Sequence, residues 1–230
     1  MTQFIRLPQL KIFAPSTEKN LMFISGGRPP TLEWLLDCSK NIDRIWCIDH
    51  GIDTCRQADL IPELLIGDLD SARSDSIVWA QQKNVAIEKF PVDKDFTDTQ
   101  LALDRASELD EPPYIIITGA FGGRIDHLHA TLFSCAHSKL CICLADQREV
   151  IAFVRDGKSI RLQFDVKPTA LSLLPFSDVC KGVSIDGVHW TLDRADIHQS
   201  LPTAVSNRVE NDIVNVSIER GTLAIALTFD

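Results

Sequence analysis

Short apolar runs alternate with longer segments of helical periodicity over the first part of the chain, from Leu21 to about Ala145. An apolar run bounded by turn residues predicts a strand covered on both faces, and a helical segment between two such runs predicts a crossover connection. This part therefore predicts an α/β domain with a mostly parallel sheet. The predicted strands are Leu21–Ser25, Arg44–Ile48, Leu64–Gly67, Tyr114–Thr118 and Leu140–Ala145.

The segments between these runs carry the helical signals. An apolar stripe at spacings of three and four predicts a helix from Ile125 to Cys135. A similar stripe covers Leu101–Leu109, and two further segments are uninterrupted by Gly or Pro, namely Thr31–Cys38 and Ser74–Gln82. These helices would flank the sheet.

The pattern changes after about Val150. Apolar residues such as Leu223, Ile225 and Leu227 alternate with small or polar ones, and turn signals such as Asp156-Gly157 separate the segments. Period two with frequent turns predicts an antiparallel β-sandwich. We therefore expect an α/β domain over residues 1–150 and a β-sandwich domain over residues 151–230.

Composition and charge narrow the possible classes of protein. The chain has 230 residues, of which 45% are hydrophobic, and this is enough for a full core. A net charge of −9 argues against broad nucleic-acid binding, which needs a basic face. No segment predicts a membrane span, and Met1–Phe13 lacks the apolar core of a signal peptide, so we expect a cytoplasmic protein. The scattered cysteines predict reduced thiols rather than a disulfide framework or a zinc site.

An acidic turn follows the predicted strand Leu64–Gly67. Asp68 and Asp70 would lie just beyond the carboxyl end of a buried strand, where ligands collect in open α/β sheets. One interpretation is a magnesium-phosphate site. The other is a helix start at which Asp70 or Ser71 caps the next segment. The turn by itself does not decide between them.

A second acidic segment, Asp93–Gln100, precedes the helix predicted at Leu101. Thr97 and Gln100 have capping-box spacing, which gives a structural explanation for both. Asp98 falls within the apolar stripe of that helix, so its carboxylate would face the interior or a cleft. A buried charge favours a role with a cation, while stabilisation by the helix dipole is the alternative.

A glycine-rich segment, Gly119–His127, follows the predicted strand Tyr114–Thr118. Gly122 and Gly123 would let backbone N–H groups approach an anion at a helix start, and Arg124 would add positive charge. Asp126 could cap the helix or orient Arg124. If the sheet is doubly wound, the three segments converge, and carboxylates for Mg²⁺ beside groups for phosphate make a site for nucleotide triphosphate chemistry.

The combined motifs closely resemble the thiamine pyrophosphokinase family. The resemblance extends over nearly the whole chain, and its order and spacing are specific although each piece is short. It is carried by Asp49-His-Gly51, Gly67-Asp-Leu-Asp-Ser71, Lys94-Asp-Phe-Thr-Asp98, Gly122-Gly-Arg-Ile-Asp-His127, Gly187-Val-His-Trp-Thr-Leu192 and Val205-Ser-Asn207.

The resemblance implies an α/β domain that binds ATP and Mg²⁺ and a β-sandwich that forms a thiamine pocket across a homodimer. The thiamine hydroxyl would attack the β-phosphorus of ATP, releasing AMP. By the same resemblance, the metal-organising carboxylates would be Asp68, Asp70 and Asp98, with Asp49 nearby. The phosphates would be contacted or oriented by Thr97, Gly122, Gly123, Arg124 and Asp126, and thiamine by Trp190, Ser206 and Asn207.

The chain departs from the family's usual pattern at two positions. His50 stands where the family usually has glycine, so a side chain occupies a place where the backbone often approaches the ligand, and Leu69 replaces a usual phenylalanine. Two other functions stay open: transfer to another heterocyclic alcohol such as a pterin, and a sensor that binds without transfer. The general base also stays open between Asp70 and Asp98.

Overall fold

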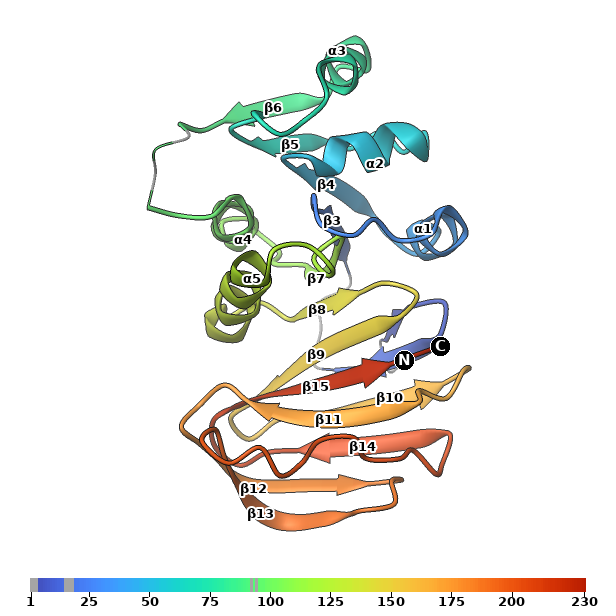
Figure 1. The fold of residues 1–230 in the computed structure, drawn as a ribbon, viewed down its shortest axis with the longest axis vertical. Helices are drawn as coiled ribbons and strands as arrows, with labels where there is room; N and C mark the ends of the chain where they lie inside the picture. Colours follow the sequence, from blue (N-terminus) through green and yellow to red (C-terminus); the bar gives the residue numbers. More distant parts are fainter. Residues whose placement is uncertain (1–3, 15–18, 92, 94) are drawn as a thin grey trace. The chain divides into compact units, whose positions relative to one another are not determined.

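The computed structural model describes residues 4–14, 19–91, 93 and 95–230. They form two compact units, one within residues 17–140 and one made of residues 1–16 together with 141–230. Figure 1 shows the helices and strands of both. Lys94, which belongs to one of the family motifs, lies outside the described residues.

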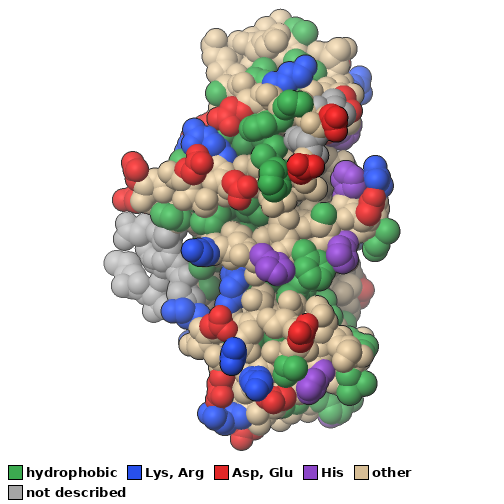
Figure 2. All heavy atoms as spheres, turned by 90° about the vertical axis from the view of Figure 1, so that its left-hand side faces the viewer, with side chains coloured by type: hydrophobic (Ala, Val, Ile, Leu, Met, Phe, Trp, Pro, Cys, Tyr) green, Lys and Arg blue, Asp and Glu red, His purple; other side chains and the backbone are tan. Residues whose placement is uncertain are grey.

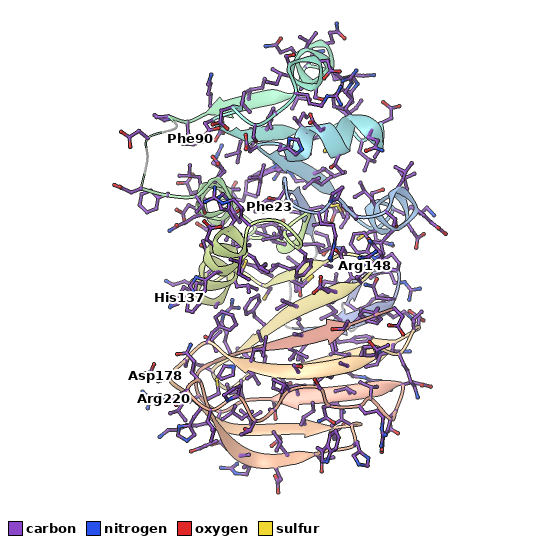
Figure 3. All side chains as sticks on the ribbon, viewed as in Figure 1. Phe23, Phe90, His137, Arg148, Asp178 and Arg220 are labelled. Carbon is purple, nitrogen blue, oxygen red and sulfur yellow. The ribbon has the colours of Figure 1, made fainter. Side chains whose placement is uncertain are left out.

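The first unit contains a parallel sheet with the strand order β7-β3-β4-β5-β6. Strands β5 and β7 are apolar and buried over their whole lengths, as expected for strands covered on both faces. Phe23 of β3, labelled in Figure 3, is buried in the interior. It stacks on Trp46 of β4, with ring centroids 5.6 Å apart. The strands are β3 (Asn20–Ile24), β4 (Arg44–Ile48), β5 (Leu64–Gly67), β6 (Ala86–Lys89) and β7 (Tyr114–Thr118).

Helices connect these strands, and α2 packs against α3 while α4 packs against α5 (Figure 1). The helix predicted at Leu101 begins earlier, at Asp98, because the Thr97 hydroxyl accepts a hydrogen bond from the Gln100 amide at 3.2 Å. The helices are α1 (Leu32–Ser39), α2 (Gly51–Gln57), α3 (Ser74–Gln82), α4 (Asp98–Ser107) and α5 (Ile125–His137).

The turn between β4 and α2 is tight because of one glycine. A Cβ atom on Gly51 would lie 1.8 Å from the carbonyl oxygen of Ile24. Only glycine therefore lets α2 start directly against the carboxyl end of β3. This contact places Asp49, the residue that follows β4, at the edge of the sheet where the parallel strands end.

The second unit is antiparallel throughout, which confirms the predicted β-sandwich. One group of strands has the order β1-β2-β10-β14-β12-β13, and the other contains β11, β15, β9 and β8. The bounds are β1 (Ile5–Arg6), β2 (Leu10–Phe13), β8 (Ile142–Ala145), β9 (Glu149–Arg155), β10 (Ser159–Phe164), β11 (Ala170–Pro175), β12 (Val179–Asp186), β13 (Leu192–His198), β14 (Ile213–Ser217) and β15 (Thr222–Thr228).

The compact units divide the chain at a different place from the expected domains. The expected boundary at residue 150 falls inside β9, and the N-terminal strand β2 pairs with β10 of the sandwich. The Gln9 side chain also donates to the carbonyl of Asp146 at 2.7 Å. The N-terminal segment therefore completes the sandwich rather than the α/β unit.

All seven cysteines are free thiols, and all but Cys141 are buried. Among the described residues, no helix has the length and apolar character that crossing a membrane requires.

Candidate active site

Three aspartates meet at the edge of the α/β unit where the parallel strands end. Asp49 follows β4, and Asp68 and Asp70 follow β5, the neighbouring strand. Each of the three offers a carboxylate oxygen, and these oxygens all lie within 4.8 Å of one another. Figure 2 looks onto a face of the molecule on which Asp and Glu side chains are prominent in the upper part, formed by this unit. The sheet topology thus brings Asp49, which the family resemblance placed near the site, together with the predicted acidic turn of Asp68 and Asp70.

Glycine makes the close approach of the two loops possible. The backbone of Gly67 has a φ of 151°, and a Cβ atom there would lie 3.0 Å from the Cβ of Asp49. The Asp49 amide donates to the carbonyl of Ile66 at 2.8 Å. The end of β5 is therefore held against Asp49. A side chain at residue 67 would push the Asp49 carboxylate away from those of Asp68 and Asp70.

The turn that carries Asp68 and Asp70 has an unusual backbone. Leu69 has a φ of 66°, in the left-handed region that is costly for a branched apolar residue. The Asp70 amide donates to Oδ1 of Asp68 at 3.0 Å, which closes an Asx turn. Such strain persists only where surrounding contacts enforce it, and it is typical of functional sites.

Two side chains hold this turn from the β4 loop. The Ser71 hydroxyl donates to Oδ2 of Asp49, and Nδ1 of His50 lies 2.9 Å from the carbonyl oxygen of Ser71. His50, which stands where the family usually has glycine, thus contacts the acidic turn. Its side chain does not displace Asp49 from the group of carboxylates.

The carboxylates repel one another. The pKa of Asp70 is raised above its ordinary value. The largest cause is the side-chain hydrogen bond with Asp68, and the next is the negative charge of Asp68. The charges of Asp49 and Asp98 raise it further, so Asp98 at the start of α4 acts on the same cluster. Oδ1 of Asp49 is buried and has no hydrogen-bond partner among the described residues. Several carboxylate oxygens with one left unbonded fit a hard divalent cation such as Mg²⁺.

A glycine-rich loop follows β7 at the same edge of the sheet. It is fastened to the loop after β3, since the Gly27 amide donates to the Gly119 carbonyl and the Arg28 amide to the Phe121 carbonyl, each at 2.6 Å. Sequence reasoning found Gly122 and Gly123 but missed the β3 loop. The signal was present, because Gly26-Gly27-Arg28 repeats the tripeptide Gly122-Gly123-Arg124.

Arg124 and Asp126 form an ion pair at the start of α5. The Arg124 guanidinium donates to both carboxylate oxygens of Asp126, at 3.1 and 2.5 Å. This pair lowers the pKa of Asp126 to about 2 and raises that of Arg124. Asp126 Oδ1 also accepts from the His127 amide at 3.0 Å, so this carboxylate both pairs with Arg124 and bonds to the first turn of α5, and the two roles considered from the sequence do not exclude each other. Thr97 caps α4, as described above, so its hydroxyl has a structural partner.

The residues expected to contact thiamine meet in the β-sandwich unit. The indole of Trp190 is exposed, with 60% of the residue accessible. The Asn207 side chain accepts from the Trp190 amide at 3.1 Å and donates to the Trp190 carbonyl at 2.8 Å. Ser206 has a φ of 58°, and its amide donates to the Ser172 hydroxyl at 3.0 Å. Asn207 thus fixes the backbone that presents the indole.

A parallel sheet with carboxylates gathered beyond the carboxyl ends of its strands is the arrangement in which α/β enzymes bind phosphorylated ligands together with a divalent cation. Two family models match the chain: the catalytic domain of thiamin pyrophosphokinase at residues 35–144, and the vitamin B1 binding domain of thiamin pyrophosphokinase at residues 159–223. The chain belongs to the thiamine pyrophosphokinase family, whose general reaction transfers diphosphate from ATP to thiamine.

Individual relatives agree with the family models. Thiamine pyrophosphokinase of Bacillus subtilis is 26% identical over 216 residues, covering 92% of this chain and 100% of the relative. The crystal structure of the Bacillus subtilis enzyme gives a TM-score of 0.79 at 24% identity, covering 92% of this chain and 100% of that one. The yeast enzyme gives 0.73 at 15% identity, covering 94% and 88%. These structures confirm the predicted fold class.

The repulsion among the carboxylates makes a prediction for Asp70→Asn. The raised pKa of Asp70 means that ionisation of this carboxyl disfavours the folded state. The free energy of unfolding therefore falls as the pH rises from the pKa of Asp70 in the unfolded chain through its higher pKa in the folded protein. At neutral pH the variant should therefore unfold at a higher temperature than the wild type when no metal is present. Added Mg²⁺ should raise the unfolding temperature of the wild type more than that of the variant. Thermal unfolding with and without Mg²⁺ measures both effects.

Asp75→Asn is the matched control for this prediction. Its pKa is lowered by Arg56, so the same change of charge should lower the unfolding temperature at neutral pH and leave the Mg²⁺ effect intact. An equal Mg²⁺ effect in the wild type and in Asp70→Asn would remove Asp70 from the metal site.

Proposed function

We propose that this chain performs the family reaction at the carboxyl edge of its parallel sheet, with Mg²⁺ held by Asp68, Asp70 and Asp98 and with Asp49 beside them. The observation that carries the proposal is the convergence of carboxylate oxygens of Asp49, Asp68 and Asp70 within 4.8 Å at that edge. Asp98 is not one of that group, and its charge acts on Asp70 from the start of α4. Bound Mg²⁺ would neutralise charge on the phosphates of ATP. The catalytic part would lie within the first 150 residues, apart from the N-terminal segment that pairs with the sandwich, and the thiamine-binding part within residues 151–230.

Group transfer of this kind depends mainly on alignment and on charge neutralisation. The thiamine hydroxyl oxygen forms a bond to the β-phosphorus of ATP, the bond between that phosphorus and the bridging oxygen to the α-phosphate breaks, and AMP leaves with that oxygen. Asp70 or Asp98 accepts the hydroxyl proton. Arg124, oriented by Asp126, contacts the phosphates together with the backbone of Gly122 and Gly123. Thr97 orients them at the start of α4.

Thiamine is an aromatic cation, and Trp190 offers it an exposed ring face. Stacking and cation–π attraction would both act on the bound ligand. The hydrogen bonds of Asn207 to both backbone groups of Trp190 keep this face in place, with Ser206 beside it. Pocket residues that are held before binding lower the entropy cost of binding.

We further propose a cytoplasmic homodimer in which each site takes its ATP half from one subunit and its thiamine half from the other. Trp190 shares a segment of the sandwich with two other exposed apolar residues, Leu201 at 60% and Val205 at 48% accessibility. Exposed large apolar side chains that are close in the chain are typical of surfaces that another molecule covers.

The reaction itself is tested by its products. Purified protein with ATP, Mg²⁺ and thiamine should produce AMP and thiamine diphosphate in equal amounts, because one diphosphate leaves each ATP. Removal of Mg²⁺ by a chelator should stop turnover. Formation of ADP and thiamine monophosphate would contradict attack at the β-phosphorus. Tight binding of both substrates without turnover would identify a sensor, and turnover of a pterin alcohol instead of thiamine would change the acceptor.

Trp190→Ala tests the thiamine half. Loss of stacking and of cation–π attraction should raise the KM for thiamine roughly tenfold or more, with little change in the KM for ATP. Steady-state kinetics with each substrate varied in turn separate the two constants. Trp79→Ala in α3 is the control for loss of a tryptophan elsewhere, and both its KM values should stay near those of the wild type. Equal rises of both KM values in Trp190→Ala would show that Trp190 is structural.

A mixture of two variants tests the shared site. Asp70→Asn should lack the ATP half and Trp190→Ala the thiamine half, so neither is active at low thiamine concentration. After subunit exchange the equal mixture should recover about a quarter of the wild-type activity, because about half of the dimers are mixed and each mixed dimer has one intact site of two. Activity no higher than the mean of the two variants would show that each chain holds a complete site.

A further inference from the structure

Two segments of the sandwich unit lie side by side around Trp190. Val188 and Val209 form an antiparallel bridge between them, and the His189 amide donates to the Arg208 carbonyl at 2.9 Å. This pairing and the side-chain amide that bonds to both backbone groups of Trp190 fix the backbone on which the indole is carried. They do not fix the direction of the exposed ring, because a side chain can still rotate about its own torsion angles.

The imidazole of His189 lies against the indole of Trp190. The two ring centroids are 4.7 Å apart, and the ring planes are nearly perpendicular, at 88°. Edge-to-face pairs of aromatic rings at such a distance are favourable beyond the area that they bury. His189 therefore restricts the rotation of an indole that is otherwise exposed.

Glu210 in turn holds the imidazole. Nδ1 of His189 lies 2.7 Å from Oε1 of Glu210. A carboxylate only accepts hydrogen bonds, so Nδ1 is the donor in this contact and cannot also accept from Arg208. The Arg208 guanidinium, which lies 3.0 Å from Nδ1 and 3.9 Å from the same carboxylate oxygen, acts on the pair through its charge. The Glu210 amide donates to the Gly187 carbonyl at 3.0 Å, so the carboxylate is carried on a backbone that is itself held.

We propose that His189 is a positioning residue for thiamine: it keeps the Trp190 indole in the orientation on which thiamine stacks, and Glu210 acts through His189. The inference rests on the proposed function, because it takes Trp190 to be the residue that stacks on thiamine. An aromatic cation is attracted over the face of a ring, and a ring that is oriented before binding loses less entropy when the ligand arrives. Neither His189 nor Glu210 is assigned a contact with the reacting atoms, so their effect falls on the affinity for thiamine and not on kcat.

Thiamine binding by the whole protein tests the role of His189. In His189→Ala the dissociation constant for thiamine, measured by calorimetry without ATP, should rise about 2- to 10-fold because the ring contact is lost. His189→Phe keeps an aromatic ring beside the indole and should recover most of the affinity. In steady-state kinetics the KM of His189→Ala for thiamine should rise, while kcat and the KM for ATP should stay as in the wild type.

Variants of Glu210 test whether it acts through the imidazole. Glu210→Gln keeps an oxygen that accepts from Nδ1, so its dissociation constant for thiamine should stay within about twofold of the wild type. Glu210→Ala releases the imidazole and should weaken thiamine binding, but less than His189→Ala does. In a protein that already carries His189→Ala, the change Glu210→Ala should have no further effect, because the two residues form one chain of contacts.

His137→Ala is the matched control. His137, labelled in Figure 3, is also an exposed histidine beside an aromatic ring, with its ring centroid 6.1 Å from that of Phe133, but it ends α5 in the α/β unit. Its loss should leave the dissociation constant for thiamine as in the wild type.

The possible outcomes are distinct. Unchanged thiamine affinity in His189→Ala would overturn the proposal, and so would equal rises of both KM values with a lower unfolding temperature, which would make His189 structural. Equal losses of affinity in Glu210→Gln and Glu210→Ala would show that the charge of Glu210 itself attracts thiamine, which also contradicts the proposal. If the wild type binds thiamine but forms no thiamine diphosphate, the proposed function fails while the dissociation constants still decide the role of His189. If the wild type does not bind thiamine, both proposals fall.

Discussion

Electrostatic repulsion among Asp49, Asp68 and Asp70 is the constraint on which the rest of the α/β unit depends. Carboxylate oxygens within 4.8 Å of one another stay together in the absence of a cation only if the backbone holds them. The backbone holds them through three features: the parallel pairing of β4 with β5, the close contact between Gly67 and Asp49, and the left-handed conformation of Leu69. Repulsion among the carboxylates thus lowers the stability of the fold, and in return the site is organised before a cation arrives. This is common where function and stability compete.

Much of the fold follows from hydrophobic periodicity, and the exceptions have physical reasons. Buried strands such as Tyr114–Thr118 were predicted with their observed bounds, since fully covered strands are continuous apolar runs. The edge strand β6, Ala86–Lys89, was missed because its ends are exposed and one is charged. Helix α2 was missed because it starts at Gly51 without a side-chain cap. The pairing of β2 with β10 is a contact between distant parts of the chain, which no local pattern contains.

The candidate site likewise has residues that the sequence predicted and contacts that it did not. Asp68 and Asp70 were predicted because the end of a buried apolar strand is visible in the sequence, and Asp98 because it interrupts an apolar stripe. The three-dimensional meaning of Asn207 was not visible. It was expected to line a pocket, which stays a prediction, and the structure adds that its amide bonds to both backbone groups of Trp190. Bonding partners of a side chain amide depend on tertiary packing, so a motif can mark such a residue without revealing its contacts.

His50 shows how one position can change without loss of the site. Its backbone has a φ of −57°, an ordinary helical value, so the position does not require the glycine that the family usually has there. Gly26 leaves the space for the side chain of His50, because a Cβ atom on Gly26 would lie 2.7 Å from the Cβ of His50. The imidazole then reaches the Ser71 carbonyl and so joins the β4 loop to the acidic turn. Since Gly26 also begins the loop that carries Arg28, the side chain at residue 50 couples the shape of the β3 loop to that of the acidic turn, and substitutions at residues 26 and 50 should not be additive.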